Sequence, residues 1–134
     1  MTVLHSTLLS LAEFSHGFGT RRTGRDESAA RIHILRQVHG ERIVLLGSMD
    51  RSPNVRPREN PRYAMRHLPV HPFRFDEGDA LITDIPGVSL GIRTADCLPI
   101  LVADTATGSV AAIHGGWRSL ALGLAAKGVL ALLE

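Results

Sequence analysis

The second half of the chain restricts the possible folds most strongly, because it contains four short apolar segments separated by turns. These segments are rich in β-branched and apolar side chains and comprise residues 80–83, 88–94, 98–103 and 110–113. The Asp-Thr-Ala-Thr-Gly sequence at 104–108 is typical of a turn, so we expect the strands on its two sides to pair as an antiparallel hairpin. The sequence therefore predicts that most of the core lies within residues 80–113.

The residues after this predicted sheet have helical periodicity and are apolar on two sides. One predicted face contains Leu120, Leu124 and Ala131, and the other contains Leu122, Val129 and Leu133. A helix that is apolar nearly all round must be covered on more than one side. We therefore expect self-association through this helix, or cover by sequence that lies beyond residue 134.

Glycines and prolines divide the first half of the chain. Residues 32–38 and 42–46 are β-branched and apolar, and His39-Gly40 between them predicts the tip of a second hairpin. Five of the seven prolines fall within residues 48–79, so this segment is expected to be a loop or insertion, and neither a long helix nor an interior strand. His39 is thus expected at a turn that precedes a long loop.

Size and composition limit the class of protein. A chain of 134 residues with 44% hydrophobic residues is long enough for one core, so we expect a single domain over residues 1–134. No apolar run approaches the ~20 residues needed to cross a membrane, and the N-terminus lacks the pattern of a secretion signal. A net charge of +2 gives no sign of nucleic-acid binding. A cytoplasmic globular protein is expected.

The lone cysteine, Cys97, forms the strongest candidate site together with His114. A single cysteine excludes a disulfide within the chain and leaves metal ligation, nucleophilic chemistry or simple burial. If opposed positions of the predicted hairpin sum to about 211–213, Cys97 faces a position between 114 and 116. An offset of two residues is about 7 Å along a strand. A thiolate and an imidazole at neighbouring strand ends could therefore share one ion or one proton.

Two chemistries can use this pair. Cys97, His114 and a third ligand could bind Zn²⁺ with a fourth position open for water or substrate. His39 is the best third ligand, because it lies on its own turn beside the flexible Gly40. Alternatively, His114 could activate Cys97 as a nucleophile, with Asp96 or a distant polar group orienting the imidazole. The sequence does not separate the two alternatives.

The residues that follow His114 could contribute to substrate binding. Gly115 and Gly116 allow close approach of the backbone, and Arg118 could bind phosphate or carboxylate through two hydrogen bonds. Trp117 could stack on a flat ring, although a tryptophan at the start of a helix is more often part of the core.

Three other polar residues are weaker candidates. His16, beside Gly17 and Arg21, could line the same pocket. Asp96 could orient a ligand or cap a turn. Asp79, which precedes the predicted strand at 80–83, could support a ligand, but a simple turn residue is the favoured interpretation.

Five short motifs follow one another in a specific order along the chain. They are His16-Gly-Phe-Gly-Thr-Arg21, Gln37-Val-His-Gly40, Asp79-Ala-Leu-Ile-Thr83, Thr94-Ala-Asp-Cys-Leu-Pro99 and His114-Gly-Gly-Trp-Arg118. Together they resemble the purine nucleoside phosphorylase family formerly called laccase-domain or multicopper polyphenol oxidase proteins. The resemblance implies an α+β fold of mixed β-sheets layered with helices, also described as cytotoxic-necrotizing-factor-like. Residues 1–134 would then be the N-terminal part of a longer family domain.

The resemblance also implies a function and a set of site residues. His39, Cys97 and His114 would bind the metal, usually zinc with copper as the alternative. The implied reactions are phosphorolysis of adenosine, inosine and methylthioadenosine, and deamination of adenosine. For these reactions we expect Arg118 and Arg21 to hold phosphate, Trp117 to contact the nucleoside and Asp96 to carry a proton.

Three alternatives stay open beside this interpretation. One is a metal-independent hydrolase or transferase that uses Cys97 and His114. Another is the copper-dependent polyphenol oxidase of the older family name, although none of the seven histidines forms the His-x-His pairs on which a four-copper site depends. The third is an inactive, truncated domain that associates through its apolar helix.

Overall fold

The computed structural model describes residues 3–4, 14–19, 32–47, 63–65 and 77–133, and the chain divides into two compact units, Met1–Ala30 and Arg31–Glu134. In the N-terminal unit, β1 (Val3–Leu4) pairs antiparallel with β2 (Phe18–Gly19). All other described elements belong to the second unit, which contains the candidate site.

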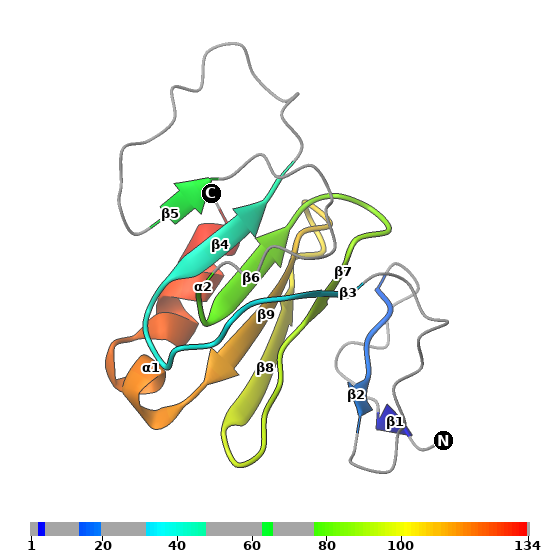
Figure 1. Cartoon of the computed structure of the whole chain (residues 1–134). Coiled ribbons are helices and arrows are strands. Elements are labelled where there is room, and N and C mark those ends of the chain that lie inside the picture. Colours follow the sequence, from blue (N-terminus) through cyan, green and yellow to red (C-terminus); the bar gives the residue numbers. More distant parts are fainter. Residues whose placement is uncertain (1–2, 5–13, 20–31, 48–62, 66–76, 134) are drawn as a thin grey trace. The chain divides into compact units, whose positions relative to one another are not determined.

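A five-stranded mixed sheet forms the centre of the second unit, with the strand order β5-β4-β6-β9-β8 (Figure 1). The strands are β4 (Ile43–Leu46), β5 (Tyr63–Met65), β6 (Ala80–Thr83), β8 (Leu98–Ala103) and β9 (Val110–Gly115). β4 is parallel to β5 and β6, whereas β9 is antiparallel to β6 and β8. The β8–β9 pairing confirms the predicted hairpin, and its register places Leu98 opposite Gly115.

The predicted hairpin between residues 32–38 and 42–46 is wrong. β3 (Ile32–Ile34) pairs in parallel with β7 (Ser89–Gly91) in a separate two-stranded sheet, while β4 joins the main sheet. Burial explains the difference, since Ile43 and Val44 point to opposite sides of the sheet and are each only 1% exposed. A strand buried on both sides is typical of the interior of a parallel arrangement rather than of an isolated hairpin.

Alternate residues of the central strands pack on opposite sides of the main sheet, as the two-residue period of a strand requires. One side carries the larger apolar cluster, formed by Ile43, Ala80, Ile82, Ala111, Ile113, Leu124 and Leu132. The other side carries a smaller cluster of Leu35, Val44 and Leu81, against which Leu90 of β7 packs. The second unit is therefore α+β, with mixed sheets layered with helices, as predicted.

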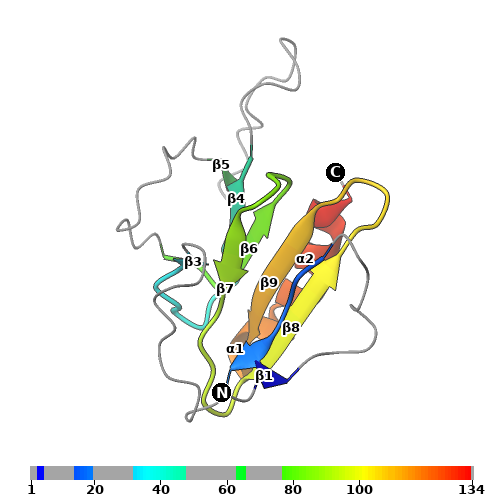
Figure 2. The same cartoon turned by 90° about the vertical axis from the view of Figure 1, so that its right-hand side faces the viewer.

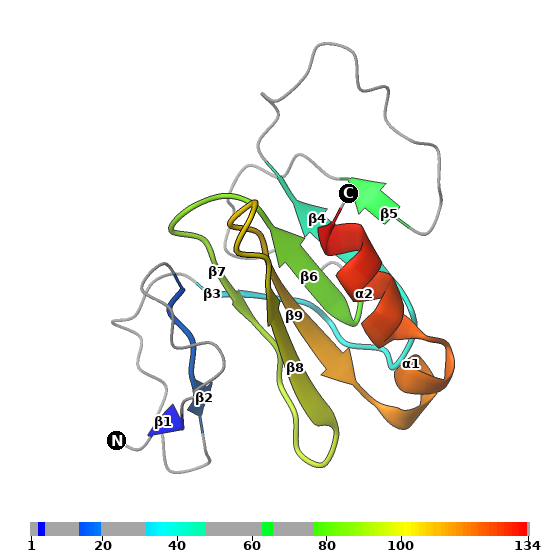
Figure 3. The same ribbon diagram turned by 180° about the vertical axis from the view of Figure 1, so that it is seen from behind.

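Two helices follow β9 where one was predicted. α1 (Trp117–Ala121) and α2 (Leu124–Leu132) are separated at Gly123, whose φ of 77° lies in the left-handed region that favours glycine. α2 lies against the main sheet at β6 and β9 (Figures 2 and 3). Its Leu124 and Leu132 belong to the larger cluster. No helix among the described residues is long and apolar enough to cross a membrane.

The predicted apolar faces of the C-terminal segment are divided between the core and the surface. Leu124 is fully buried, whereas Leu120, Leu122, Val129 and Leu133 are between 38% and 64% exposed. What covers these exposed side chains stays a prediction, as does the assignment of residues 1–134 to one domain.

The segment predicted as a loop or insertion, residues 48–79, is described only at 63–65 and 77–79. Its described strand, β5, lies at the edge of the main sheet rather than in its interior. The loop assignment of the remaining residues lies outside the described part of the chain.

Ser119 provides a test of this packing. Its side chain is fully buried in α1, and its hydroxyl has no hydrogen-bond partner among the described residues. Because an unpaired buried hydroxyl is unfavourable and Ala is a better helix former than Ser, Ser119→Ala should raise the free energy of unfolding by about 1 kcal/mol. Urea denaturation measures this change.

Ser109→Ala is the matched control, because the Ser109 hydroxyl accepts a hydrogen bond from Thr107 at 2.9 Å. This control should lower the free energy of unfolding. A Ser119→Ala protein less stable than the wild type would contradict the described burial of that hydroxyl.

Candidate metal centre

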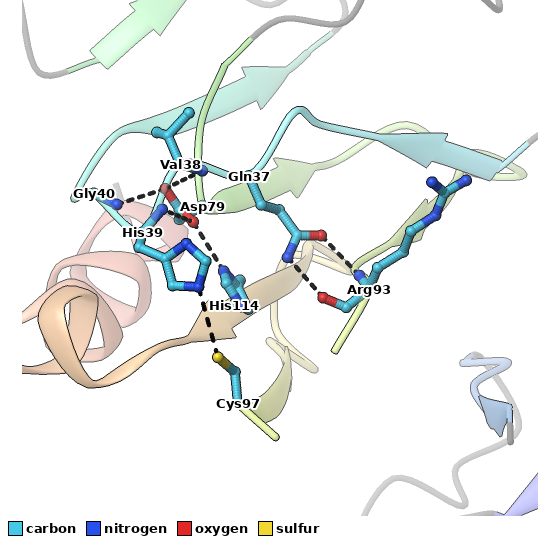
Figure 4. Close-up of polar contacts among 8 residues, drawn as sticks. All are labelled: Gln37, Val38, His39, Gly40, Asp79, Arg93, Cys97 and His114. Atoms are coloured by element: carbon cyan, nitrogen blue, oxygen red, sulfur yellow. Dashed lines mark hydrogen bonds and ion pairs between the residues drawn. The ribbon is translucent and has the colours of Figure 1, made fainter. Parts of the chain in front are cut away.

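The turn that carries His39 folds around the carboxylate of Asp79. Oδ1 of Asp79 accepts a hydrogen bond from the backbone N–H of His39 at 2.9 Å. Oδ2 accepts from the N–H groups of Gly40 at 2.8 Å and Val38 at 3.3 Å (Figure 4). Three successive N–H groups thus point at one anion, the arrangement called a nest.

This nest explains the unusual backbone of His39, whose φ of 59° is the single positive value among the described residues other than glycine. The left-handed conformation costs a non-glycine residue about 1–2 kcal/mol. Each hydrogen bond to a charged group contributes about 1.5–3 kcal/mol, so the three bonds to Asp79 offset the strain. Asp79 therefore fixes the backbone conformation from which the His39 side chain extends.

The same carboxylate orients His114. Nδ1 of His114 lies 2.9 Å from Oδ1 of Asp79, and the two side chains are 3% and 0% exposed. Because a carboxylate can only accept, a neutral His114 ring in this contact carries its proton on Nδ1 and has its lone pair on Nε2. A histidine ligand held in this way by a carboxylate is a common feature of zinc sites.

Cys97 reaches His114 through the β8–β9 hairpin. Cys97 directly precedes β8, and His114 is the penultimate residue of β9. In the hairpin, His114 lies opposite Pro99. The antiparallel register therefore brings the thiol to the end of β9, as predicted from the sequence.

The ligand atoms of His39, Cys97 and His114 all lie within 4.8 Å of one another. Sγ of Cys97 is 3.8 Å from Nε2 of His39, and the two imidazole rings meet edge to face with centroids 4.7 Å apart. Tetrahedral zinc, with bonds of ~2.3 Å to sulfur and ~2.1 Å to nitrogen, separates such ligands by ~3.6 Å. The three side chains thus fit one metal ion, with His39 on the exposed side and His114 buried.

Gly116 leaves the space that this convergence requires. A Cβ atom at this position would lie 2.9 Å from Cδ2 of His39 and 3.7 Å from both Sγ of Cys97 and Cε1 of His114. The backbone of Gly116 has ordinary extended angles, so the glycine is needed for close approach rather than for conformational freedom.

Three of the expected substrate residues, Asp96, Trp117 and Arg118, lie within the described part of the chain. Asp96 is exposed beside Cys97, and Arg118 is exposed on α1. The expectation that Trp117 belongs to the core is wrong, because its side chain is 74% exposed and carries the Arg118 guanidinium 5.2 Å from the ring centroid. Arg21 lies outside the described residues, and half-buried His16 belongs to the N-terminal unit.

The interpretation of Asp79 as a simple turn residue is also wrong. The residue does lie at a bend before β6, but its buried carboxylate holds both histidines. A lone Asp before a strand gives no local signal of this role, because its partners lie 35 to 41 residues away. The Asp79-Ala-Leu-Ile-Thr83 motif was the one available pointer.

Comparisons with known proteins find relatives of this chain. The model of the family described as multi-copper polyphenol oxidoreductase laccase matches residues 19–134. The purine nucleoside phosphorylase of Aquifex aeolicus is 48% identical over 58 residues, which cover 43% of this chain and 27% of that protein. A protein named adenosine deaminase, from an unknown prokaryotic organism, is 46% identical over 52 residues, 39% of this chain and 20% of that protein.

Solved structures share the fold. The crystal structure of a Neisseria meningitidis protein of the DUF152 family matches with a TM-score of 0.54 and 27% identity, over 77% of this chain and 34% of that one. YfiH of Bacillus licheniformis matches with a TM-score of 0.51 and 28% identity, over 72% and 32% of the two chains. The chain spans about a third or less of the length of these relatives. Since the family model covers most of its residues, this chain belongs to the family described as multi-copper polyphenol oxidoreductase laccase.

Proposed function

We propose that this chain carries the metal centre of a purine nucleoside phosphorylase, with a purine nucleoside and phosphate as substrates. The observation that carries the proposal is the convergence of the ligand atoms of His39, Cys97 and His114. The names of relatives such as the Aquifex aeolicus purine nucleoside phosphorylase support the reaction.

Zinc is the proposed metal, because a thiolate and two imidazoles belong to the ligand types that zinc takes in sites with three protein ligands. Copper is the alternative, since it binds such ligands more tightly when it is available. A bound metal would polarise a substrate oxygen as a Lewis acid. The chain's own contribution is the fixed proton on Nδ1 of His114, which leaves Nε2 free to ligate.

Phosphorolysis breaks the bond between ribose and base and forms a bond between ribose and a phosphate oxygen. The base leaves with the electron pair and takes up a proton. We propose that the exposed Arg118 guanidinium binds phosphate, that Arg21 assists it, and that the exposed Trp117 ring contacts the nucleoside. Asp96, beside Cys97, is the proposed proton carrier.

Deamination of adenosine at the same site is a second candidate, favoured by the similarity to a protein named adenosine deaminase. In that reaction water replaces the amino group of the purine and ammonia leaves.

A metal-independent Cys97 nucleophile is a third candidate, because the Asp79–His114 pair could also assist a thiol. Rapid alkylation of Cys97 by iodoacetamide whether or not zinc is present would favour the nucleophile, and protection by zinc would favour the metal centre.

Asp79→Asn tests the metal centre. The amide cannot accept all the hydrogen bonds that the carboxylate receives, so both histidines lose their fixed orientation and zinc affinity should fall by about 10- to 100-fold. Competition with a chromogenic chelator measures this affinity. Asp104→Asn is the matched control, because Asp104 lies in the exposed β8–β9 turn and bonds only within that turn among the described residues. Equal zinc affinity of Asp79→Asn and wild type would contradict the assigned role.

The reaction is tested with zinc-loaded protein and inosine. Hypoxanthine should appear only when phosphate is present, and Cys97→Ser should reduce its rate at least about 100-fold because the metal is lost. Chromatography of the released base provides the measurement. Release without phosphate, or no release by a folded, zinc-loaded preparation, would overturn the proposed phosphorolysis.

A further inference from the structure

Gln37 links the two chain segments that deliver His39 and Cys97. Its Nε2 donates a hydrogen bond to the backbone carbonyl of Arg93 at 2.7 Å, and its Oε1 accepts one from the Arg93 N–H at 2.7 Å (Figure 4). A single side chain thus pairs with both polar groups of one residue that lies 56 positions away in the sequence.

The contact between Gln37 and Arg93 lies just beyond the end of the β3–β7 backbone ladder. β3 and β7 run in parallel, and their ladder ends where Ile34 lies opposite Gly91. Beyond that point Arg36 forms its bridge with Glu77 instead. Continued at the same register, residue 39 would lie opposite residue 96, next to Cys97. Between the end of this ladder and the ligands, the Gln37 side-chain amide therefore supplies the hydrogen bonds that join the two segments.

No backbone ladder among the described residues joins these two segments at the ligands. Cys97 and His114 are tied by the β8–β9 hairpin, and His39 and His114 are tied by Asp79. His39 and Cys97 touch only through their own side chains, at 3.8 Å. Both residues are tied to His114, and the contact between Gln37 and Arg93 adds a direct link between the segments that carry His39 and Cys97.

We propose that Gln37 is a positioning residue that sets the spacing between His39 and Cys97 and so controls how tightly the centre holds its metal. The inference rests on the proposed metal centre and not on the reaction. The Gln37 amide forms its two hydrogen bonds with the Arg93 backbone and not with a ligand atom, so it acts through the two segments that carry the ligands.

Zinc affinity of three variants tests the proposal. Gln37→Ala removes both hydrogen bonds, and Gln37→Glu keeps the shape and the acceptor but loses the donor. Each should weaken zinc binding about tenfold, the lower range for outer partners of a metal site. Arg36→Ala is the matched control, because it removes only the neighbouring exposed ion pair with Glu77 and should leave affinity unchanged.

A double variant separates positioning from a general loss of stability. In a His39→Ala background, which lacks one member of the spaced pair, Gln37→Ala should cause no further loss of zinc affinity. An equal loss in both backgrounds, or wild-type affinity of Gln37→Ala, would overturn the proposal. Zinc binding without hypoxanthine release would overturn only the proposed phosphorolysis, so the two failures are distinguishable.

Discussion

The buried carboxylate of Asp79 is the interaction on which the arrangement of the site depends. It receives hydrogen bonds from three successive backbone N–H groups of the His39 turn and from the ring of His114. An isolated carboxylate is costly to bury, and these four donors replace the water that it loses. The conformation of the His39 turn and the orientation of both histidines therefore depend on the same carboxylate.

The fold supplies the remaining constraints from opposite directions. The antiparallel hairpin brings Cys97 to His114 from one edge of the main sheet, while the parallel β3–β7 pair brings the His39 turn from a second layer. Gly116 lets the backbone pass beside all three side chains. A site assembled in this way needs segments spread over the described residues from 32 to 116, although each individual contact is short.

Local pairing explains which parts of this arrangement could be predicted from the sequence. The β8–β9 hairpin closes over a six-residue connection, so its register, and with it the meeting of Cys97 and His114, follows from the strand pattern and turn residues. The parallel pairing of β3 with β7 joins residues 57 positions apart and leaves no turn signature, so the nearest apolar segment was wrongly chosen as the partner. His39 was nevertheless correctly expected at a turn.

The supporting residues escaped prediction for a related reason. Asp79 and Gln37 act on groups that lie 35 or more positions away, and nothing in their immediate neighbours distinguishes them from turn and surface residues. Trp117 shows a different error, since a tryptophan at the start of a helix favours a core position, whereas this side chain is exposed. These cases show that sequence patterns identify pairing between neighbouring segments better than partners across layers or the exposure of a single side chain.

X-ray absorption spectroscopy at the zinc edge examines the metal centre most directly. The account predicts one sulfur at ~2.3 Å and imidazole nitrogens at ~2.0–2.1 Å around zinc bound to the wild-type chain. A zinc shell without sulfur, or one whose sulfur persists in Cys97→Ser, would contradict it.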